Sequence, residues 1–291
     1  MNWRSPQIVV RAAQPSCIAE ANRLAQLTGL AFCELTETPA PEPNEDSSPW
    51  TLLVKPTDLS LIRPDGLYIE IDFIHGRGTR RSREANFHSQ PLARALNLRK
   101  LRQRTDQKPT LIDATAGFGT DGWMMASLGC KVRLLEASPV LAAMLTQALT
   151  NARCGAPKNT SNHARDKQYE HSPAHNISVI NTNSVQFLHN HENAGADIIY
   201  LDPMYPQTRS KALVKKGMQL LHDLIGPDTN GAQLLCAALK RAEYRVVVKR
   251  PRGAPPLEGT TNFTGQTSTV KSTNTRYDIY HIRHSSSPSK I

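Results

Sequence analysis

The sequence has few cysteines and no cysteine pairs, which argues against two classes of small, covalently stabilised domain. Among its 291 residues the five cysteines are scattered singly, as Cys17, Cys33, Cys130, Cys154 and Cys236. Disulfide frameworks and zinc ribbons both require cysteines at close, regular spacing. We therefore expect reduced thiols and no bound metal ion.

Long apolar runs are missing as well. No stretch approaches the roughly 18 apolar residues that a membrane-spanning helix needs, and the opening MNWRSPQIVVRAAQ lacks the apolar centre of a secretory signal. The apolar content of 39% is nevertheless ordinary for a globular chain of this length with a substantial core. These features predict a cytoplasmic protein that does not enter a membrane.

Positive charge is concentrated in one segment of the chain. Residues 77–104 contain nine Lys or Arg residues against a single acid, Glu84, and so account for most of the net charge of +10. Such a block indicates a polyanionic partner, of which a nucleic acid is the usual example. A solvated helix face is the alternative that charge alone leaves open.

The pattern of apolar residues divides the chain into three parts. We expect residues 1–76 to form a small α/β subdomain and residues 77–109 to form a basic connecting segment. From 110 to 291 strands and helices alternate at crossover spacing, which predicts a doubly wound, mostly parallel sheet. In such a sheet the ligand binds at the carboxyl ends of the strands.

Individual elements follow from the same periodicity. In the first part we expect strands at 7–12, 51–56 and 67–73 and a helix that begins at Ser16 and ends at Gly29. In the third part we expect strands at 110–114, 131–136, 177–182, 197–202, 244–251 and 276–283, with helices at 121–128, 138–152, about 209–225 and 231–242. The almost wholly polar segment 155–176 reads as a disordered insertion, and its histidines do not have metal-ligand spacing.

A glycine-rich turn follows the first strand of the third part. In DATAGFGTDG, Gly117, Gly119 and Gly122 satisfy the pattern G-x-G-x-x-G, and Glu136 ends the next strand, where it can accept hydrogen bonds from ribose hydroxyls. This arrangement suits a dinucleotide such as NAD, and hence a dehydrogenase. It suits S-adenosylmethionine (SAM) as well, because both ligands present an adenosine to the second strand.

Two acids in this turn separate the alternatives. Asp113 precedes Gly117 by four residues, and Asp121 opens the following helix. A pyrophosphate would be repelled by these carboxylates, whereas the ammonium and sulfonium groups of SAM would be attracted to them. The turn therefore favours SAM.

The stretch YLDPMYP, residues 200–206, ends a predicted strand with groups suited to methylation of an amine. The lone pair of a base's exocyclic amine is delocalised, so hydrogen-bond acceptors on its N–H bonds assist attack on a methyl donor. Asp202 and the Pro203 carbonyl can be those acceptors, and Tyr205 can stack on the base. This chemistry needs neither a metal ion nor a covalent nucleophile.

These motifs resemble those of a known family. DPMY is similar to the (D/N)-P-P-(Y/F) motif of amino-group methyltransferases. The longer set DATAGFGTDGWMMASLGCKVRLLEASP, YLDPMYP, KALVKKGMQLLHDLIGPD and RVVVKRP, spread between residues 66 and 283, resembles the small-subunit ribosomal RNA methyltransferase J family. The resemblance implies a class I SAM-dependent methyltransferase fold with a small N-terminal α+β subdomain. It also implies that N2 of one guanosine in 16S ribosomal RNA is the methyl acceptor.

The resemblance further implies particular contacts. SAM is expected to contact Thr120, Asp121, Glu136, Ala137, Asn183, Ser184 and Asp202. The RNA backbone is expected to contact Arg80, Arg81, Arg83, Lys249 and Arg250. Two other functions stay open at this point: an NAD-dependent dehydrogenase, and a non-catalytic RNA-binding or ribosome-assembly protein.

Overall fold

A computed structural model describes most of the chain. The described residues are 5–34, 49–76, 90–103, 107–154, 172–204, 216–226, 230–258 and 263–282. Their contacts group into two compact units that interleave along the sequence. The first unit comprises the described residues within 1–77, 138–175 and 206–227, and the second comprises the remainder. This grouping concerns contacts, not independent folding, so the domain boundaries at residues 76 and 109 stay predictions.

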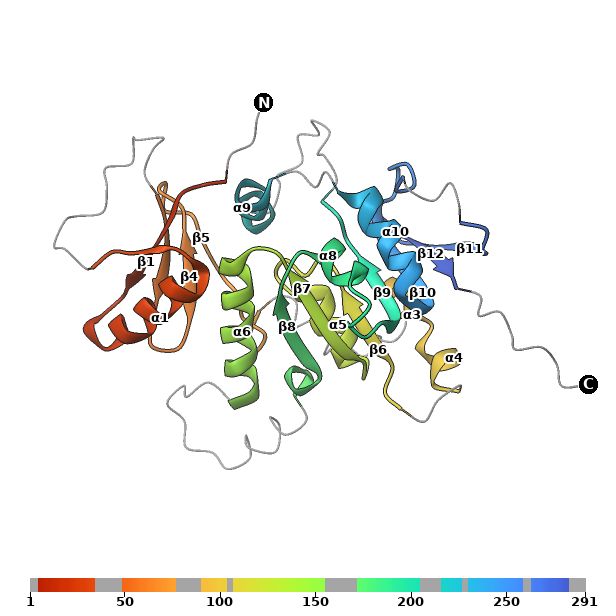
Figure 1. Ribbon diagram of the computed structural model, residues 1–291, viewed down its shortest axis with the longest axis horizontal. Helices are drawn as coiled ribbons and strands as arrows, with labels where there is room; N and C mark the ends of the chain where they lie inside the picture. The colour runs from red at the N-terminus through yellow and green to blue at the C-terminus, as the bar shows by residue number, and fades with distance from the viewer. Residues whose placement is uncertain are drawn as a thin grey trace, which may run out of the picture. The chain divides into compact units, whose positions relative to one another are not determined.

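The first unit contains a five-stranded mixed sheet in the order β2-β1-β3-β4-β5. Three of its strands, β1, β4 and β5, are labelled in Figure 1. Its strands are β1 (Ile8–Ala12), β2 (Ala31–Phe32), β3 (Trp50–Val54), β4 (Leu59–Ile62) and β5 (Tyr68–Glu70). Strand β1 runs parallel to β2 and β3, whereas β3, β4 and β5 pair antiparallel. The small N-terminal α+β subdomain is thereby confirmed.

Several details of this unit differ from the sequence prediction. The two-residue strand β2 was not predicted. The end of the segment 155–176, predicted to be disordered, contains a short 3₁₀ turn, Pro173–Asn176, in which Ala174 is fully buried. Strand β4 was not predicted, because Leu59, Ser60 and Leu61 are all buried and show no alternation; the Ser60 hydroxyl donates to the Glu70 carboxylate. Helix α1 (Ile18–Thr28) does not begin at Ser16, since a short 3₁₀ turn, Pro15–Cys17, precedes it. Its end at Gly29 is confirmed, with φ of 70° in the left-handed region.

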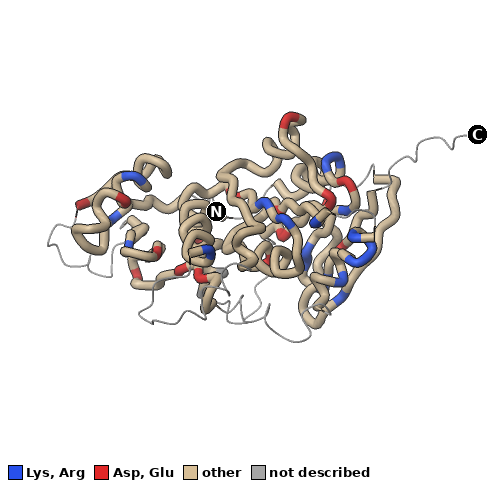
Figure 2. Tube along the Cα trace, turned by 90° about the horizontal axis from the view of Figure 1, so that it is seen from below, with Lys and Arg blue, Asp and Glu red and all other residues tan. Residues whose placement is uncertain are grey.

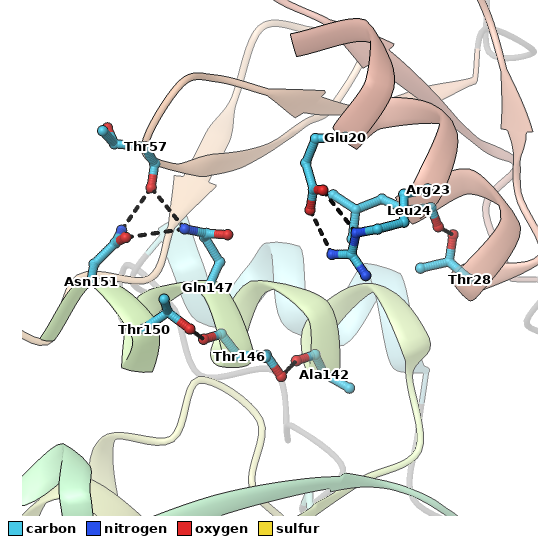
Figure 3. A network of polar contacts seen from close by, with 10 residues as sticks. All are labelled: Glu20, Arg23, Leu24, Thr28, Thr57, Ala142, Thr146, Gln147, Thr150 and Asn151. Carbon is cyan, nitrogen blue, oxygen red and sulfur yellow. Dashed lines mark hydrogen bonds and ion pairs between the residues drawn. The ribbon is translucent and has the colours of Figure 1, made fainter. Parts of the chain in front are cut away.

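Helix α6 (Pro139–Cys154) is fastened to the loop between β3 and β4 by side-chain amides (Figure 3). The amide nitrogens of Gln147 and Asn151 both donate to the Thr57 carbonyl, at 3.2 and 2.7 Å. Asn151 also donates to the Asp58 carboxylate at 3.0 Å. Helix α9 (Lys216–Ile225) belongs to the same unit, where Asp223 accepts a hydrogen bond from Arg63. Long-range polar contacts thus complete a unit whose segments are far apart in sequence.

The second unit contains a seven-stranded sheet in the order β11-β12-β10-β9-β6-β7-β8. Its strands are β6 (Thr110–Asp113), β7 (Lys131–Glu136), β8 (Ile177–Asn181), β9 (Ala196–Leu201), β10 (Ala242–Pro251), β11 (Thr267–Lys271) and β12 (Thr275–His281). Five adjacent strands run parallel to one another: β10, β9, β6, β7 and β8. Strand β12 is antiparallel to both of its neighbours, β10 and β11. The predicted doubly wound sheet is confirmed. The exposed edge strand β11 was missed because its polar sequence TSTVK resembles a loop.

The helices of this unit are α3 (Pro91–Leu96), α4 (Leu98–Arg102), α5 (Thr120–Ser127), α8 (Ser184–His189) and α10 (Gly231–Arg241). Apolar residues of α8 and α10 pack on one face of the sheet, against alternate strand residues such as Ile112, Ile199 and Val248. Because successive residues of a strand point to opposite faces, Asp113, Tyr200 and Lys249 belong to the other face. No helix in the described part of the chain is both long enough and apolar enough to span a membrane.

We expect Asn151→Ala to destabilise the protein by about 1 kcal/mol, because it removes the two hydrogen bonds from α6 to Thr57 and Asp58. Urea denaturation followed by circular dichroism measures the loss. Thr150→Ala is the matched control, since the exposed Thr150 hydroxyl bonds only to the Thr146 carbonyl of its own helix. Equal stability of the two variants would contradict the prediction.

Candidate functional site

The glycine turn lies at the carboxyl end of β6 and leads directly into α5. Gly117 and Gly119 have φ of 53° and 68°, a conformation that side-chain-bearing residues rarely adopt. Gly122 is needed for a different reason, because a Cβ atom there would lie 2.3 Å from Cδ2 of Leu134 in β7. The turn therefore packs closely against the neighbouring strand and presents backbone rather than side chains to a ligand.

Glu136 connects the end of β7 to this turn. Its carboxylate is 5% exposed, and Oε2 accepts a hydrogen bond from the Gly117 backbone N–H at 2.9 Å. The Asn181 amide in turn donates to the carbonyls of Glu136 and Ala137. The acid expected to bind ribose thus lies beside the glycine turn, at the same edge of the sheet.

Asn183 and Ser184 bring the end of β8 to the same edge. The Asn183 side chain caps α8 by accepting from the Gln186 backbone N–H at 3.1 Å, and the Ser184 hydroxyl donates to the Ala114 carbonyl at 2.7 Å. All the segments predicted to bind SAM therefore lie at the carboxyl ends of β6, β7, β8 and β9.

Asp113, the last residue of β6, is buried beneath the turn with 1% of its surface exposed. Its carboxylate accepts a hydrogen bond from the Thr115 backbone N–H at 3.1 Å. Burial, together with the nearby negative charge of Asp121, raises the pKa of Asp113 to about 8. A cation brought next to this carboxyl group would favour its ionised form.

A chain of short polar contacts joins α5, β9 and β10. The Tyr200 hydroxyl donates to Oδ2 of Asp121 at 2.5 Å. The Lys249 ammonium donates to the same oxygen and to Oδ2 of Asp202, each at 2.8 Å. The Asp202 backbone N–H donates to the Thr115 hydroxyl at 2.7 Å, which ties the end of β9 to the turn after β6.

Opposite charges determine the ionisation of this chain of contacts. Burial alone would lower the pKa of Lys249, but the carboxylates of Asp121 and Asp202 raise it well above its ordinary value. Burial raises the pKa of Asp202, and the positive charge of Lys249 opposes that increase. Burial also raises the pKa of Tyr200, so its hydroxyl stays protonated as a donor. The site thus holds a fixed ammonium between two carboxylates.

The residues predicted to bind RNA have different positions. Lys249 lies in this polar cluster rather than on an outer surface. Arg250 is 4% exposed and donates to the Pro255 carbonyl, at 3.1 and 3.3 Å, so its position does not support a phosphate contact. Arg80, Arg81, Arg83 and the stacking residue Tyr205 lie outside the described residues. The described part of the basic block, residues 90–103, includes Arg94, Arg99, Lys100 and Arg102 and no acid. Figure 2 draws the described Lys and Arg residues in blue and the described acids in red along the chain.

Sequence reasoning missed the roles of Thr115, Tyr200 and Lys249. The register of the sheet shows why they meet, since Asp113 pairs with Tyr200 and Val248 pairs with Leu201. Lys249 is therefore level with Asp202 and on the same face as Asp113. The sequence did show polar residues at alternate positions near the ends of the strands, which places them on one face of the sheet. This pattern identifies neighbouring side chains only once the strand order is known.

The fold and the site together define a class I SAM-dependent methyltransferase. A family described as "Putative SAM-dependent methyltransferase" matches residues 38–282 of the chain. The crystal structure of a SAM-dependent methyltransferase from Neisseria gonorrhoeae is similar, with a TM-score of 0.65 and 25% identity over 94% of this chain and 96% of that one.

Curated relatives define the family more narrowly. The ribosomal RNA small subunit methyltransferase J of Hydrogenovibrio crunogenus is 38% identical over 91% of each chain. The protein of the same name from Pseudomonas aeruginosa strain UCBPP-PA14 is 33% identical over 95% of each chain. The chain therefore belongs to the ribosomal RNA small subunit methyltransferase J family, which confirms the resemblance seen in its motifs. SAM rather than NAD is the cofactor.

The residues present fit that cofactor. Two glycines with positive φ allow its close approach to the backbone, and the buried Asp113 carboxyl offers a counter-ion for an ammonium group. A pyrophosphate would instead face the carboxyl groups of Asp113 and Asp121. Contacts of individual residues with SAM stay predictions.

We expect the unfolding free energy of the SAM-free protein to fall as pH rises from about 4 to about 8, through Asp113. Its folded pKa of about 8 lies above the unfolded value, so between these limits the folded state binds more protons. The contribution of Asp113 to the unfolding free energy is largest below about pH 4. Between about pH 4 and pH 8 it declines by up to about 1.4 kcal/mol per pH unit. Asp113→Asn keeps the acceptor for Thr115 but cannot titrate.

Urea denaturation of both proteins between about pH 5 and pH 7.5 measures this contribution as the wild-type stability minus that of Asp113→Asn. The difference should decrease as pH rises. A difference that is independent of pH would show that Asp113 does not titrate in this window.

Proposed function

We propose that this protein transfers the methyl group of SAM to the exocyclic N2 amine of a guanosine in the 16S RNA of the small ribosomal subunit. The observation that supports this most directly is the position of Asp202 and Pro203, at the end of β9 and joined to the glycine turn through Thr115. The ribosomal substrate follows from the names of the relatives. The amine follows from the likeness of DPMY to the motif of amino-group methyltransferases.

For this methyl transfer the protein mainly has to position the methyl donor and the base. SAM, when bound, supplies a methyl group on a positively charged sulfur. Guanine N2 is a weak nucleophile because its lone pair is delocalised, and acceptors on its two N–H bonds help it to become tetrahedral. Asp202 and the Pro203 carbonyl provide those acceptors. As the N–CH₃ bond forms, the S–CH₃ bond would break and its electron pair would stay on the sulfur, which becomes a neutral thioether. N2 would gain positive charge and lose a proton to the Asp202 carboxylate.

The cofactor residues divide into three groups by position. Asp113 and the turn at Gly117, Gly119, Thr120 and Asp121 are proposed to hold the methionine part. Glu136 is proposed to accept from the ribose hydroxyls. Ala137, Asn183 and Ser184, which follow Glu136 along the same edge, are proposed to border the adenine.

RNA is proposed to contact the basic segment that precedes the methyltransferase sheet. Arg80, Arg81 and Arg83 would hold phosphates, and Tyr205 would stack on the target base with a contribution of about 1–3 kcal/mol. Phosphate contacts position an RNA without reading its sequence. Because ribosomal RNA is the proposed substrate, we also propose that the protein acts in the cytoplasm.

We expect Asp202→Asn to reduce methyl transfer at least about 100-fold, because an amide cannot both face the Lys249 ammonium and accept the proton from N2. The measurement is incorporation of tritiated methyl groups into small subunits from cells that lack this protein. Glu192→Gln, an exposed acid on a turn, is the matched control. Wild-type rates in Asp202→Asn would refute the role of Asp202, and an inactive wild type would refute the proposed function.

We expect Arg80→Ala, Arg81→Ala and Arg83→Ala to weaken RNA binding and to flatten its dependence on salt. Each lost phosphate contact should reduce the slope of log affinity against log salt by about 0.7–0.9. Filter binding of 16S RNA at several salt concentrations measures the slope, and saturating substrate should restore the wild-type turnover. An unchanged slope in the triple variant would exclude these arginines as phosphate contacts.

A further inference from the structure

Lys249 is the one group among the described residues that contacts the carboxylates of both Asp121 and Asp202. Its ammonium lies 2.8 Å from an oxygen of each, and its side chain is 27% exposed. Asp121 belongs to the first turn of α5, beside the glycine turn, whereas Asp202 directly follows β9 and begins the DPMY motif. Lys249 therefore joins the part of the site proposed to hold SAM to the part proposed to hold the base.

The geometry leaves little of Lys249 for a phosphate. Two of its three N–H bonds point to carboxylates, and a phosphate arriving there would be repelled by both acids. These contacts favour a role for Lys249 other than the contact with the RNA backbone that the sequence analysis predicted.

We propose that Lys249 is a positioning residue for methyl transfer, which fixes the Asp202 side chain so that one carboxylate oxygen stays directed to the substrate amine. This inference rests on the proposed function. Lys249 acts through Asp202 and does not contact the base.

The contacts of Asp202 show how this works. Its backbone is fixed by the bond from its N–H to Thr115, and Oδ2 is fixed by Lys249. No described residue donates a hydrogen bond to the other carboxylate oxygen, Oδ1. We therefore assign Oδ1 as the acceptor for N2. Without Lys249 the carboxylate could rotate about χ2 and present its oxygens in many directions.

Lys249 is itself held in place from the other side. Oδ2 of Asp121 accepts from both Lys249 and Tyr200, and Tyr200 is wholly buried in β9. Two elements that flank the site thus fix the ammonium before any substrate binds. Such preorganisation is what a positioned acceptor requires, because the group need not reorient during the reaction.

The charge of Lys249 adds a second effect. An opposite charge at this distance favours the ionised form of a carboxyl group, and only ionised Asp202 can take a proton from N2. The charged and titratable groups around Asp202 in the described residues are Lys249 and Arg250 of β10, Asp121 of α5, Asp113 of β6 and Tyr200 of β9. Lys249 alone among the cations in this set bonds directly to Asp202.

The test compares Lys249→Met, which keeps the length of the side chain and removes its charge, with Lys249→Arg, which keeps the charge. Methyl transfer is measured on small subunits from cells lacking this protein, over a range of RNA concentration, salt and pH. Lys240→Met, at an exposed position of α10, is the matched control.

For Lys249→Met we expect kcat to fall about 10-fold to 100-fold, with KM for the subunit within about twofold of wild type and an unchanged salt slope. The acidic limb of the kcat–pH profile should move up by about 1 pH unit or more, because Asp202 loses its cation. Lys249→Arg should recover much of kcat and the wild-type pH limb. A merely structural role would not move that limb.

Two results would overturn the inference. One is a Lys249→Met protein with wild-type kcat and pH profile; the other is one with raised KM and a salt slope reduced by about 0.7–0.9, which would mean a phosphate contact. If Lys249→Met does not fold, Lys249→Gln, which removes the charge and keeps a hydrogen-bond donor, must show the same loss of kcat and the same movement of the pH limb. An inactive wild type would instead refute the proposed function.

Discussion

The contact between one ammonium and two carboxylates is the interaction on which this site depends. Asp113, Asp121 and Asp202 are gathered at one edge of a sheet, and three like charges that are buried or partly buried there would repel one another. Lys249 bonds to two of them, and burial raises the pKa of the third to about 8, which favours its neutral form. Remaining stable without a ligand therefore requires both a fixed cation and a carboxyl group that can keep its proton.

The parallel sheet is what brings these groups together. Strand β6 lies between β7 and β9, so the chain leaves it toward one side of the sheet and later returns on the other. At this switch point the carboxyl ends of β6 and β9 are adjacent, and the Thr115 hydroxyl joins them by accepting from Asp202. Alternation along each strand then gives Ile112, Ile199 and Val248 to the face covered by α8 and α10, and Asp113, Tyr200 and Lys249 to the opposite face.

How much of this could be read from the sequence depends on how local each feature is. The positions of the glycine turn, of Glu136 at the end of β7 and of the strand before Asp202 were predicted correctly, because turn chemistry and apolar periodicity are properties of neighbouring residues. Lys249 and Arg250 were assigned alike as basic neighbours, yet one faces two carboxylates and the other a carbonyl. Adjacent residues of a strand point in opposite directions, so only strand order and register separate them. Strands β4 and β11 escaped prediction for a related reason, since burial and edge position come from the tertiary structure.

Two acids of the site, Asp113 and Asp202, have different proposed roles. Asp113 is enclosed beneath the turn, where burial favours its neutral form until a cation arrives, so binding of the SAM ammonium should be linked to loss of a proton. Burial raises the pKa of Asp202 as well, but Asp202 is bonded to Lys249, whose positive charge opposes that increase and favours the ionised form that can accept a proton. Of these two chemically identical side chains, only Asp202 has a bonded cation that counters the effect of burial on its pKa. A lysine that contacts neither reactant is what maintains the difference, since Asp113 lacks such a partner among the described residues.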